Sequence, residues 1–326
     1  MSVVETQNLV KNYKRLQALR EVSLTVEQGE IYGLLGHNGA GKTTLIKILL
    51  GITRNWKGQA KLLGEPVGTT DIRKRVGYLP EDHRFPNYHS AVSLMNMYGQ
   101  LLGVPSGERK KRIDEMLEKV GLADRKKSKI RTYSKGMKQR LGIAQALFHD
   151  PEVIFLDEPT DGVDPSGRRQ IRHMIQELRD RKKTIFVNSH LLGELELICT
   201  RVGILRRGEL IREGTVEMLT RQTNLYTIKL ADGQEFPEAD LRQEGYKLRK
   251  IGDFWELELQ SEDQIDTIID KLRGRGLGIR HLTEKRQTLE DLFLQTMETD
   301  APQMVQPAAI QPTLVQPKDP NIQPGR

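Results

Sequence analysis

Glycines, a lysine and a threonine between residues 36 and 43 have the spacing of a phosphate-binding loop. The segment IYGLLGHNGAGKTTL contains Gly36, four intervening residues, and then Gly41, Lys42 and Thr43. Glycines let successive backbone N–H groups point at one anion, and the positive end of a following helix adds to that attraction. We expect the Lys42 ammonium to reach the β- and γ-phosphates of a nucleotide and the Thr43 hydroxyl to bind Mg²⁺.

Two acidic residues at the end of an apolar segment supply the other half of such a site. VIFLDE, residues 153–158, indicates a strand buried on both faces that ends at Asp157 and Glu158. Ligands of open α/β sheets bind beyond the carboxyl ends of the strands. We expect Asp157 to hold Mg²⁺ through water, and Glu158 to polarise the water that attacks the γ-phosphate. His190, which follows the strand-like segment TIFVN, is expected to face the same phosphate.

These side chains need a layered domain to bring them together. Residues 1 to about 220 alternate short apolar segments with helix-period segments, which predicts an α/β domain. The strands we expect are at 31–36, 153–157, 184–189 and 202–208. The helices we expect begin at Thr43, run around Ile113, and follow Ser134.

The chain changes character after about residue 220. YTIKLADGQEF, residues 226–236, places an Asp-Gly turn between alternating segments and predicts a hairpin. The other elements we expect are strands at 255–260 and 279–285, a glycine-terminated helix over 262–276, and a closing helix over 288–297 capped by Thr288. We therefore predict a small α+β domain over residues 221–298, with the closing helix packed inside it. Residues 299–326 contain six prolines and predict a disordered Pro/Gln-rich tail.

The composition is that of a globular protein with a substantial core. The chain has 326 residues, of which 37% are hydrophobic and 29% charged. No apolar run approaches the roughly 18 residues needed to span a bilayer, and the first residues lack the apolar centre of a signal peptide. The single cysteine, Cys199, excludes an internal disulfide framework and a multi-cysteine metal site, and we expect it to be buried. These features indicate an intracellular protein.

The charge leaves the partner open. A net charge of +7 permits nucleic acid, anionic lipid or phosphorylated ligands and selects none of them. Cations are densest between Glu108 and Arg131. This segment is either a solvated helix face with a loop, or a surface attracted to an anionic membrane or nucleic acid.

Taken in order, these segments resemble the nucleotide-binding subunit of ATP-binding cassette (ABC) transporters, over about residues 3–220. The family's motifs match GHNGAGKTT (Walker A, 36–44), YSKGM (signature, 133–137), VIFLDE (Walker B, 153–158), PTDGVD (D-loop, 159–164) and NSH (switch histidine, 188–190). The resemblance implies a P-loop NTPase domain of ABC type, with a helical subdomain at about 87–150. It implies that Tyr13 stacks on adenine. It also implies that the phosphates are bound by the Walker A residues Gly36, His37, Asn38, Gly39, Ala40, Gly41, Lys42, Thr43 and Thr44.

The resemblance also implies that ATP is shared between two copies of the chain. In this family two subunits stack head to tail, and each signature turn caps the ATP held by the other copy. Ser134 and the Gly136 backbone are then expected to donate to the γ-phosphate. Lys135 departs from the family pattern, and we expect it either to attract phosphate or to be solvated. Glu81 replaces the Q-loop glutamine, and we expect it to keep a link to Mg²⁺.

One cassette followed by a small C-terminal domain resembles the ATPases of exporters whose permease is a separate chain. We therefore expect an ATP- and Mg²⁺-dependent ATPase that works as a homodimer on the cytoplasmic face of the membrane, with no nucleic acid as partner. The expected contacts with the permease are Phe85, Tyr88, Met95, Met97 and Tyr98.

Other functions remain open at this stage. An importer ATPase is one alternative, and a non-transport member of the superfamily that acts on nucleic acid or the ribosome is another. A non-catalytic adaptor is disfavoured because Lys42, Asp157, Glu158 and His190 are all present.

Overall fold

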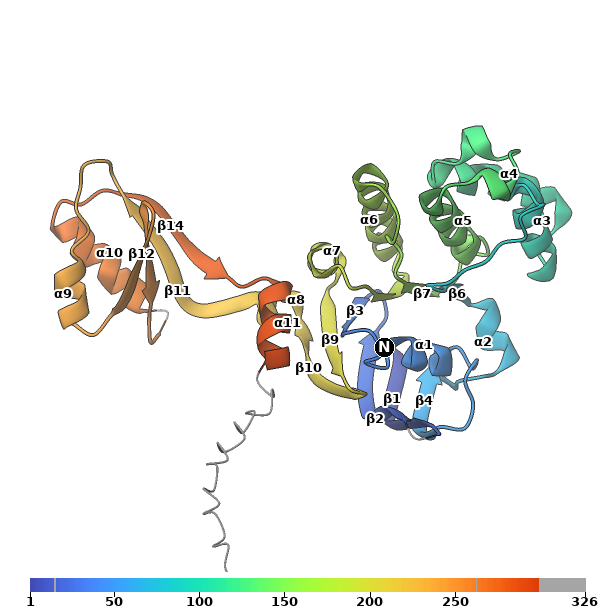
Figure 1. Ribbon diagram of the computed structural model, residues 1–326, viewed down its shortest axis with the longest axis horizontal. Coiled ribbons are helices and arrows are strands. Elements are labelled where there is room, and N and C mark those ends of the chain that lie inside the picture. The colour runs from blue at the N-terminus through green and yellow to red at the C-terminus, as the bar shows by residue number, and fades with distance from the viewer. Residues whose placement is uncertain (15, 262, 299–326) are drawn as a thin grey trace, which may run out of the picture.

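The computed structural model describes residues 1–298 except residues 15 and 262 (Figure 1). The predicted disordered tail, residues 299–326, lies outside the described residues. The strands are β1 (Ser2–Tyr13), β2 (Leu16–Glu27), β3 (Ile31–Leu35), β4 (Lys57–Leu62), β5 (Glu65–Pro66), β6 (Val76–Leu79), β7 (Val153–Asp157), β8 (Thr184–Asn188), β9 (Arg201–Arg206), β10 (Glu209–Thr215), β11 (Arg221–Leu230), β12 (Lys247–Ile251), β13 (Phe254–Glu258) and β14 (Ile279–Arg286). The helices are α1 (Lys42–Leu49), α2 (Thr70–Lys74), α3 (Ala91–Leu101), α4 (Ser106–Lys119), α5 (Lys135–Leu147), α6 (Pro165–Asp180), α7 (Leu192–Ile198), α8 (Val216–Thr220), α9 (Glu238–Gln243), α10 (Gln264–Gly274) and α11 (Leu289–Glu298), with 3₁₀ turns at Ala123–Arg125 and Ile130–Thr132.

The central sheet has the strand order β10-β9-β3-β8-β7-β6. Strands β9, β3, β8, β7 and β6 run parallel, and β10 pairs antiparallel with β9 at one edge. Every residue of β3, β7 and β8 is buried, which confirms that their continuous apolar runs form strands covered on both faces. Because parallel strands share one carboxyl edge, the residues that follow β3, β7 and β8 meet there.

The two faces of this sheet pack on different layers. In β3, Ile31 and Leu35 join a core that includes apolar residues of α3, α4, α5, α6 and α7. Tyr32 and Leu34, which point to the other face, join a core with α1 and the antiparallel sheet β2-β1-β4-β5. This alternation with a period of two residues is what a strand between two apolar layers requires. Cys199 is buried in the first core, as predicted.

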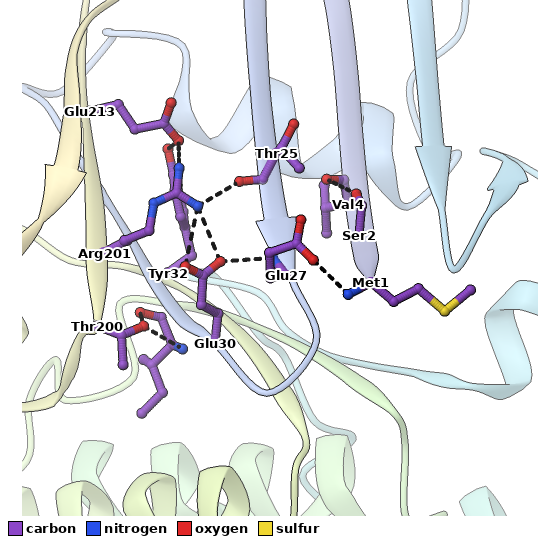
Figure 2. Close-up of polar contacts among 11 residues, drawn as sticks. Met1, Ser2, Val4, Thr25, Glu27, Glu30, Tyr32, Thr200, Arg201 and Glu213 are labelled. Atoms are coloured by element: carbon purple, nitrogen blue, oxygen red, sulfur yellow. Dashed lines mark hydrogen bonds and ion pairs between the residues drawn. The ribbon is translucent and has the colours of Figure 1, made fainter.

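A polar network ties the edge of the central sheet to the antiparallel sheet (Figure 2). The buried Tyr32 hydroxyl donates to the Glu213 carboxylate at 3.0 Å. The Arg201 guanidinium donates to Glu213 at 2.8 Å, to Glu30 at 3.2 Å and to the Thr25 carbonyl at 3.1 Å. Burial raises the pKa of the Tyr32 hydroxyl, so this group stays protonated and acts as the donor. The network joins β2, β3, β9 and β10, and it steadies the strand that leads into the phosphate-binding loop.

The C-terminal sheet has the order β12-β13-β11-β14, and α9 and α10 add Leu241, Ile268 and Leu272 to the apolar core that it forms. The prediction of a hairpin at Asp232-Gly233 is wrong. The turn forms, but β11 pairs with β13 and β14, and the chain after the turn leads into α9. Phe236 stacks on Trp255 with ring centroids 4.8 Å apart, and Pro237, which lacks an N–H donor, precedes α9, so this segment cannot extend a strand.

The closing helix α11 does not pack inside the C-terminal sheet domain, so this prediction is also wrong. Leu289, Leu292 and Phe293 belong to the core that covers the central sheet, and α11 lies against α7 and α8 (Figure 1). The expected N-cap is confirmed, since the Thr288 hydroxyl accepts from the Asp291 backbone N–H at 3.1 Å. The apolar residues of α11 are buried against the cassette, although the helix directly follows β14 of the C-terminal sheet.

Helices α3, α4 and α5 occupy the segment expected to be helical. Within it, Met95 is fully buried, so the expectation that it contacts a permease is wrong. Phe85, Met97 and Tyr98 are half-buried against the core, whereas Tyr88 is 71% exposed. Among the described residues, no helix combines the length and apolar character that crossing a membrane requires.

Candidate functional site

The phosphate-binding loop joins the carboxyl end of β3 to the first turn of α1, where its glycines touch neighbouring backbone. A Cβ at Gly36 would lie 2.4 Å from the carbonyl oxygen of Leu205, and a Cβ at Gly41 would lie 2.5 Å from that of Ala18. Gly41 also has a backbone φ of +110°, which residues with a side chain rarely adopt. Both glycines are therefore required by the close approach of β2 and β9.

The tip of this loop, residues 37–39, is exposed in front of α1. Among the residues that the structure describes, no side chain caps this helix. Its first-turn N–H groups and its positive dipole are therefore left for an anion.

Lys42 lies folded back beneath the loop. Its ammonium donates to the carbonyl oxygens of Gly36 at 2.5 Å and His37 at 3.1 Å. Burial lowers the pKa of Lys42, and the nearby carboxylates of Glu158 and Asp157 oppose that shift. Both carbonyls are weaker partners for a cation than phosphate oxygens, so this lysine can exchange them for a nucleotide.

Asp157 ends β7 directly beside the helix that follows the loop. Its Oδ2 accepts from the Thr43 hydroxyl at 3.2 Å, and its Oδ1 accepts from the Asn188 amide. Burial raises the pKa of Asp157, and the charges of Glu81 and Glu158 add to that rise. In the described part of the chain, the Oδ1 of Asn188 is buried with no hydrogen-bond partner. A buried carboxylate next to an unsatisfied oxygen is a site that a cation would stabilise.

The oxygen donors at this point suit Mg²⁺. The Thr43 hydroxyl and the Asp157 carboxylate are hard ligands, and Mg²⁺ in nucleotide sites takes one or two carboxylates with the substrate's phosphates supplying the rest. Across the described residues, no group of three or more His, Cys, Asp or Glu could hold a metal ion. A Mg²⁺ site whose remaining ligands are phosphate oxygens does not need such a group.

Glu158 and His190, the two residues expected to be catalytic, lie in direct contact. The Glu158 Oε2 lies 2.8 Å from the His190 Nδ1, and it accepts from the Ser189 hydroxyl at 3.2 Å and the His190 backbone N–H at 3.3 Å. Glu158 has a φ of +51°, a left-handed conformation that non-glycine residues adopt at a cost. Its N–H donates to the Asn188 carbonyl at 2.8 Å, which holds that conformation. The loop after β8 thus fixes the direction of the carboxylate.

The signature turn is joined to these acids within the same chain. The buried Gln139 of α5 donates to the Glu158 carbonyl at 2.7 Å, and Lys135 forms an ion pair with Asp161 at 2.7 Å. The Lys135 side chain is 66% exposed, so it is solvated, which is one of the two expected outcomes, and within this chain its charge is paired with Asp161. Ser134 caps α5 by accepting from the Met137 N–H at 3.2 Å.

A cleft of about 520 Å³ opens between these elements. It is lined by Gly36, His37, Asn38, Glu81, Glu158, Asp161, Ser189, His190, Leu192 and Phe293. His37 and Asn38 of the loop tip therefore share one cavity with Glu158, His190 and Glu81. Lys42, Thr43 and Asp157 are buried or half-buried.

Ten predicted site residues do not line this cleft. Six of them, Gly39, Ala40, Gly41, Lys42, Thr43 and Thr44, lie in the phosphate-binding loop and α1, and Asp157 ends β7. The other three, Tyr13, Ser134 and Gly136, come from other elements. Tyr13 ends β1, where the Lys11 ammonium lies 4.6 Å from its ring centroid. Ser134 and Gly136 stand at the start of α5. Ser134 is exposed, which leaves it accessible to another molecule.

Sequence reasoning missed four residues of the cleft wall as site residues: Asp161, Ser189, Leu192 and Phe293. Asp161 lies inside the D-loop motif and Ser189 inside the switch-histidine motif, so these motifs could have indicated both residues. Phe293 is more than a hundred residues from any of these motifs, and no pattern in its surroundings pointed to a nucleotide.

The fold and this site together define an ATP-binding cassette of the P-loop NTPase class. A family model described as ABC transporter matches residues 19–161. The chain is 41% identical over 305 residues to an uncharacterized ABC transporter ATP-binding protein of Synechocystis sp., and the match covers 91% of this chain and 85% of that protein. It is 34% identical over 307 residues to the bacitracin transport ATP-binding protein BcrA of Bacillus licheniformis, covering 90% of this chain and 97% of BcrA. The chain therefore belongs to the family of ABC transporter ATP-binding proteins, and this prediction is confirmed.

Solved structures support the same assignment. An ATP-binding subunit of an ABC transporter superposes with a TM-score of 0.63 at 27% identity, covering 68% of this chain and 92% of that one. A dimeric cassette in a post-hydrolysis state, bound to ADP and Pi, superposes with a TM-score of 0.61 at 25% identity, covering 65% of this chain and 98% of that one. The predicted fold class is confirmed.

Proposed function

We propose that this chain is the ATP-hydrolysing subunit of an ABC exporter and that it works as a head-to-tail homodimer on a separate permease. The observation that carries the proposal is the contact of His190 with the Glu158 carboxylate at 2.8 Å, in the cleft onto which the phosphate-binding loop opens. A cassette that only binds nucleotide has no need of a carboxylate held in this way.

In the proposed mechanism, the phosphates of ATP bind the N–H groups of the loop and the start of α1. Lys42 exchanges the carbonyls of Gly36 and His37 for β- and γ-phosphate oxygens. Tyr13 stacks on adenine. When bound, Mg²⁺ neutralises charge on the β- and γ-phosphates, and Thr43 and Asp157 would hold it, with Glu81 near the same phosphates.

The chemical step is assigned to Glu158 and His190. The carboxylate orients a water molecule and accepts its proton as the oxygen attacks the γ-phosphorus and the bond to the bridging oxygen breaks, which yields ADP and phosphate. The ring of His190 keeps the carboxylate in place and faces the γ-phosphate. The hydrogen bonds from Ser189 and the His190 backbone supply the same constraint from the loop.

The second copy completes the binding site for the γ-phosphate. Ser134 and the Gly136 N–H lie outside the cleft of their own chain, and Ser134 is exposed at the positive end of α5. They would donate to the ATP bound by the partner copy, so ATP joins the two copies and hydrolysis releases them.

Export is proposed from the named relatives. The relatives named for bacitracin transport and for linearmycin resistance align with this chain at 34% and 37% identity. Both names fit removal of a toxic compound. The permease is then a separate membrane protein, the chain lies on the cytoplasmic face, and Tyr88 is the most exposed of the residues expected to contact the permease.

A mixing experiment tests the composite site. Lys42→Ala disables the loop and Ser134→Arg disables the signature turn, so each variant alone should be inactive. In a mixture, heterodimers pair the intact loop of one chain with the intact signature of the other, and ATPase activity should return. The control is Lys42→Ala mixed with the doubly substituted chain, which should stay inactive. A mixture no more active than this control would contradict the head-to-tail arrangement.

A second experiment tests the direction of transport. The chain is co-expressed with a membrane protein that co-purifies with it, and transport is followed in inverted vesicles with MgATP. Export predicts that ATP drives cargo into the vesicle lumen. A requirement for a soluble extracytoplasmic binding protein would indicate an importer.

A further inference from the structure

The chain leaves the cassette at α8 and returns to it at α11 after forming the C-terminal sheet (Figure 1). At the junction, the Gln287 N–H donates to the Thr220 carbonyl at 2.9 Å, and the first residue of β11 pairs with the last residue of β14. The C-terminal sheet is thus joined to the cassette by two adjacent strands, and one of them leads directly into α11.

Helix α11 is anchored beside the loop after β8 that carries His190. The Leu289 N–H donates to the Glu196 carboxylate of α7 at 3.0 Å, and Arg206 of β9 donates to the Thr296 carbonyl at 2.9 Å. Leu289 and Leu292 are fully buried against the cassette. Because α7 begins two residues after His190, the helix is held at the wall of the cleft.

From this position, Phe293 reaches the phosphate-binding loop. Its ring meets the ring of His37 edge to face, with centroids 4.9 Å apart and planes at 63°. Phe293 also lines the cleft with Glu158 and His190, although it is only 7% exposed. His37 lies at the exposed tip of the loop, between two glycines at 36 and 39 that offer no side chain to hold it.

We propose that Phe293 is a positioning residue for ATP: it holds the tip of the phosphate-binding loop through the His37 ring and so makes α11 part of the nucleotide site. This inference rests on the proposed function. The loop binds phosphates with its backbone N–H groups, so a loop that is free to move must be ordered when ATP binds. The aromatic contact orders it beforehand.

The effect should appear in affinity. An edge-to-face aromatic pair is worth an amount that corresponds to about a two- to twelvefold change in a dissociation constant. The loop contacts ATP in the ground state and in the transition state alike, so losing the brace should raise KM while kcat changes less.

The test compares Phe293→Ala with Leu294→Ala in the full chain. Leu294 is the next residue of the same helix and is 51% exposed, so it controls for damage to α11. MgATP affinity, KM, kcat and thermal unfolding are measured for each. We expect weaker MgATP binding for Phe293→Ala within the range above, and values like those of the parent chain for Leu294→Ala.

A double-mutant cycle with His37→Ala separates positioning from packing. If Phe293 acts through His37, each single substitution weakens ATP binding and the double substitution adds little to either. Phe293→Tyr keeps the aromatic ring, so this variant should bind MgATP about as tightly as the parent chain. His37 is exposed, so His37→Ala tests the pair even if Phe293→Ala fails to fold.

The outcomes distinguish this inference from the proposed function. Failure of the parent chain to bind MgATP would overturn the proposed function. A parent chain that binds MgATP, with unchanged affinity in Phe293→Ala or strictly additive effects in the cycle, would overturn the role of Phe293 alone.

Discussion

Replacing Glu158 by glutamine should stop hydrolysis while leaving ATP binding intact. The substitution keeps the size of the side chain and removes its charge. The carboxylate now accepts from His190 Nδ1 at 2.8 Å, from the Ser189 hydroxyl at 3.2 Å and from the His190 N–H at 3.3 Å. A glutamine oxygen can still accept these bonds, but the amide cannot take a proton from water.

The expected sizes of the two effects are far apart. A neutral hydrogen bond contributes about 0.5–1.5 kcal/mol, so rearranging this set should cost little stability. General-base catalysis contributes about 10²- to 10⁴-fold in rate, or about 3–5 kcal/mol of transition-state stabilisation. The loss of rate should therefore dominate.

Single-turnover hydrolysis with excess protein measures this loss, and calorimetry measures MgATP binding. Asp161→Asn is the matched control, because it removes a negative charge from the same cleft without removing the proposed base. We expect a much smaller loss for Asp161→Asn. Hydrolysis by Glu158→Gln within tenfold of the parent rate would refute the assignment of Glu158.

Three further predictions concern neighbouring residues. Lys42→Ala should abolish MgATP binding in calorimetry, and unchanged affinity would remove the assignment of the phosphate-binding loop. Asp157→Asn should raise the melting temperature of the nucleotide-free chain near neutral pH. Burial raises the pKa of Asp157 above its usual 3.8, so the stability linked to this group is present below that value and lost as pH rises through the folded pKa. Melting curves from acid to neutral pH should show the advantage of Asp157→Asn shrinking toward pH 4, and a pH-independent difference would contradict the argument. Tyr32→Phe should lower the free energy of unfolding by about 1.5 kcal/mol, the lower value for a hydrogen bond to a charged group, because Arg201 still pairs with Glu213. Urea unfolding checks this, and no loss of stability would show that the network in Figure 2 is dispensable.

The phosphate-binding loop and the acids after β7 could be predicted because their chemistry depends on residues adjacent in sequence. Lys42 and Thr43 follow Gly41 directly, and Asp157 and Glu158 end a strand whose burial is visible as an unbroken apolar run. Parallel pairing then places both segments at one edge of the sheet. The roles proposed for these residues follow from their position at that edge.

The parts that could not be predicted depend on contacts between distant segments. The apolar residues of α11 indicate an amphipathic helix, but their spacing does not say which surface covers them. The Asp-Gly turn after β11 was a correct local signal, yet the strand that pairs with β11 comes from further along the chain. The ion pair between Lys135, at the start of α5, and Asp161, after β7, joins segments that only the folded sheet brings together.

The central claim is that one copy of the chain holds ATP with its phosphate-binding loop and a second copy clamps the γ-phosphate with its signature turn. The most direct measurement is a structure of the Glu158→Gln chain with MgATP. The account predicts a dimer in which the Ser134 hydroxyl and the Gly136 N–H lie within hydrogen-bonding distance of the γ-phosphate bound by the other copy. A nucleotide-bound structure in which Ser134 is remote from every γ-phosphate, in all assemblies present, would contradict it.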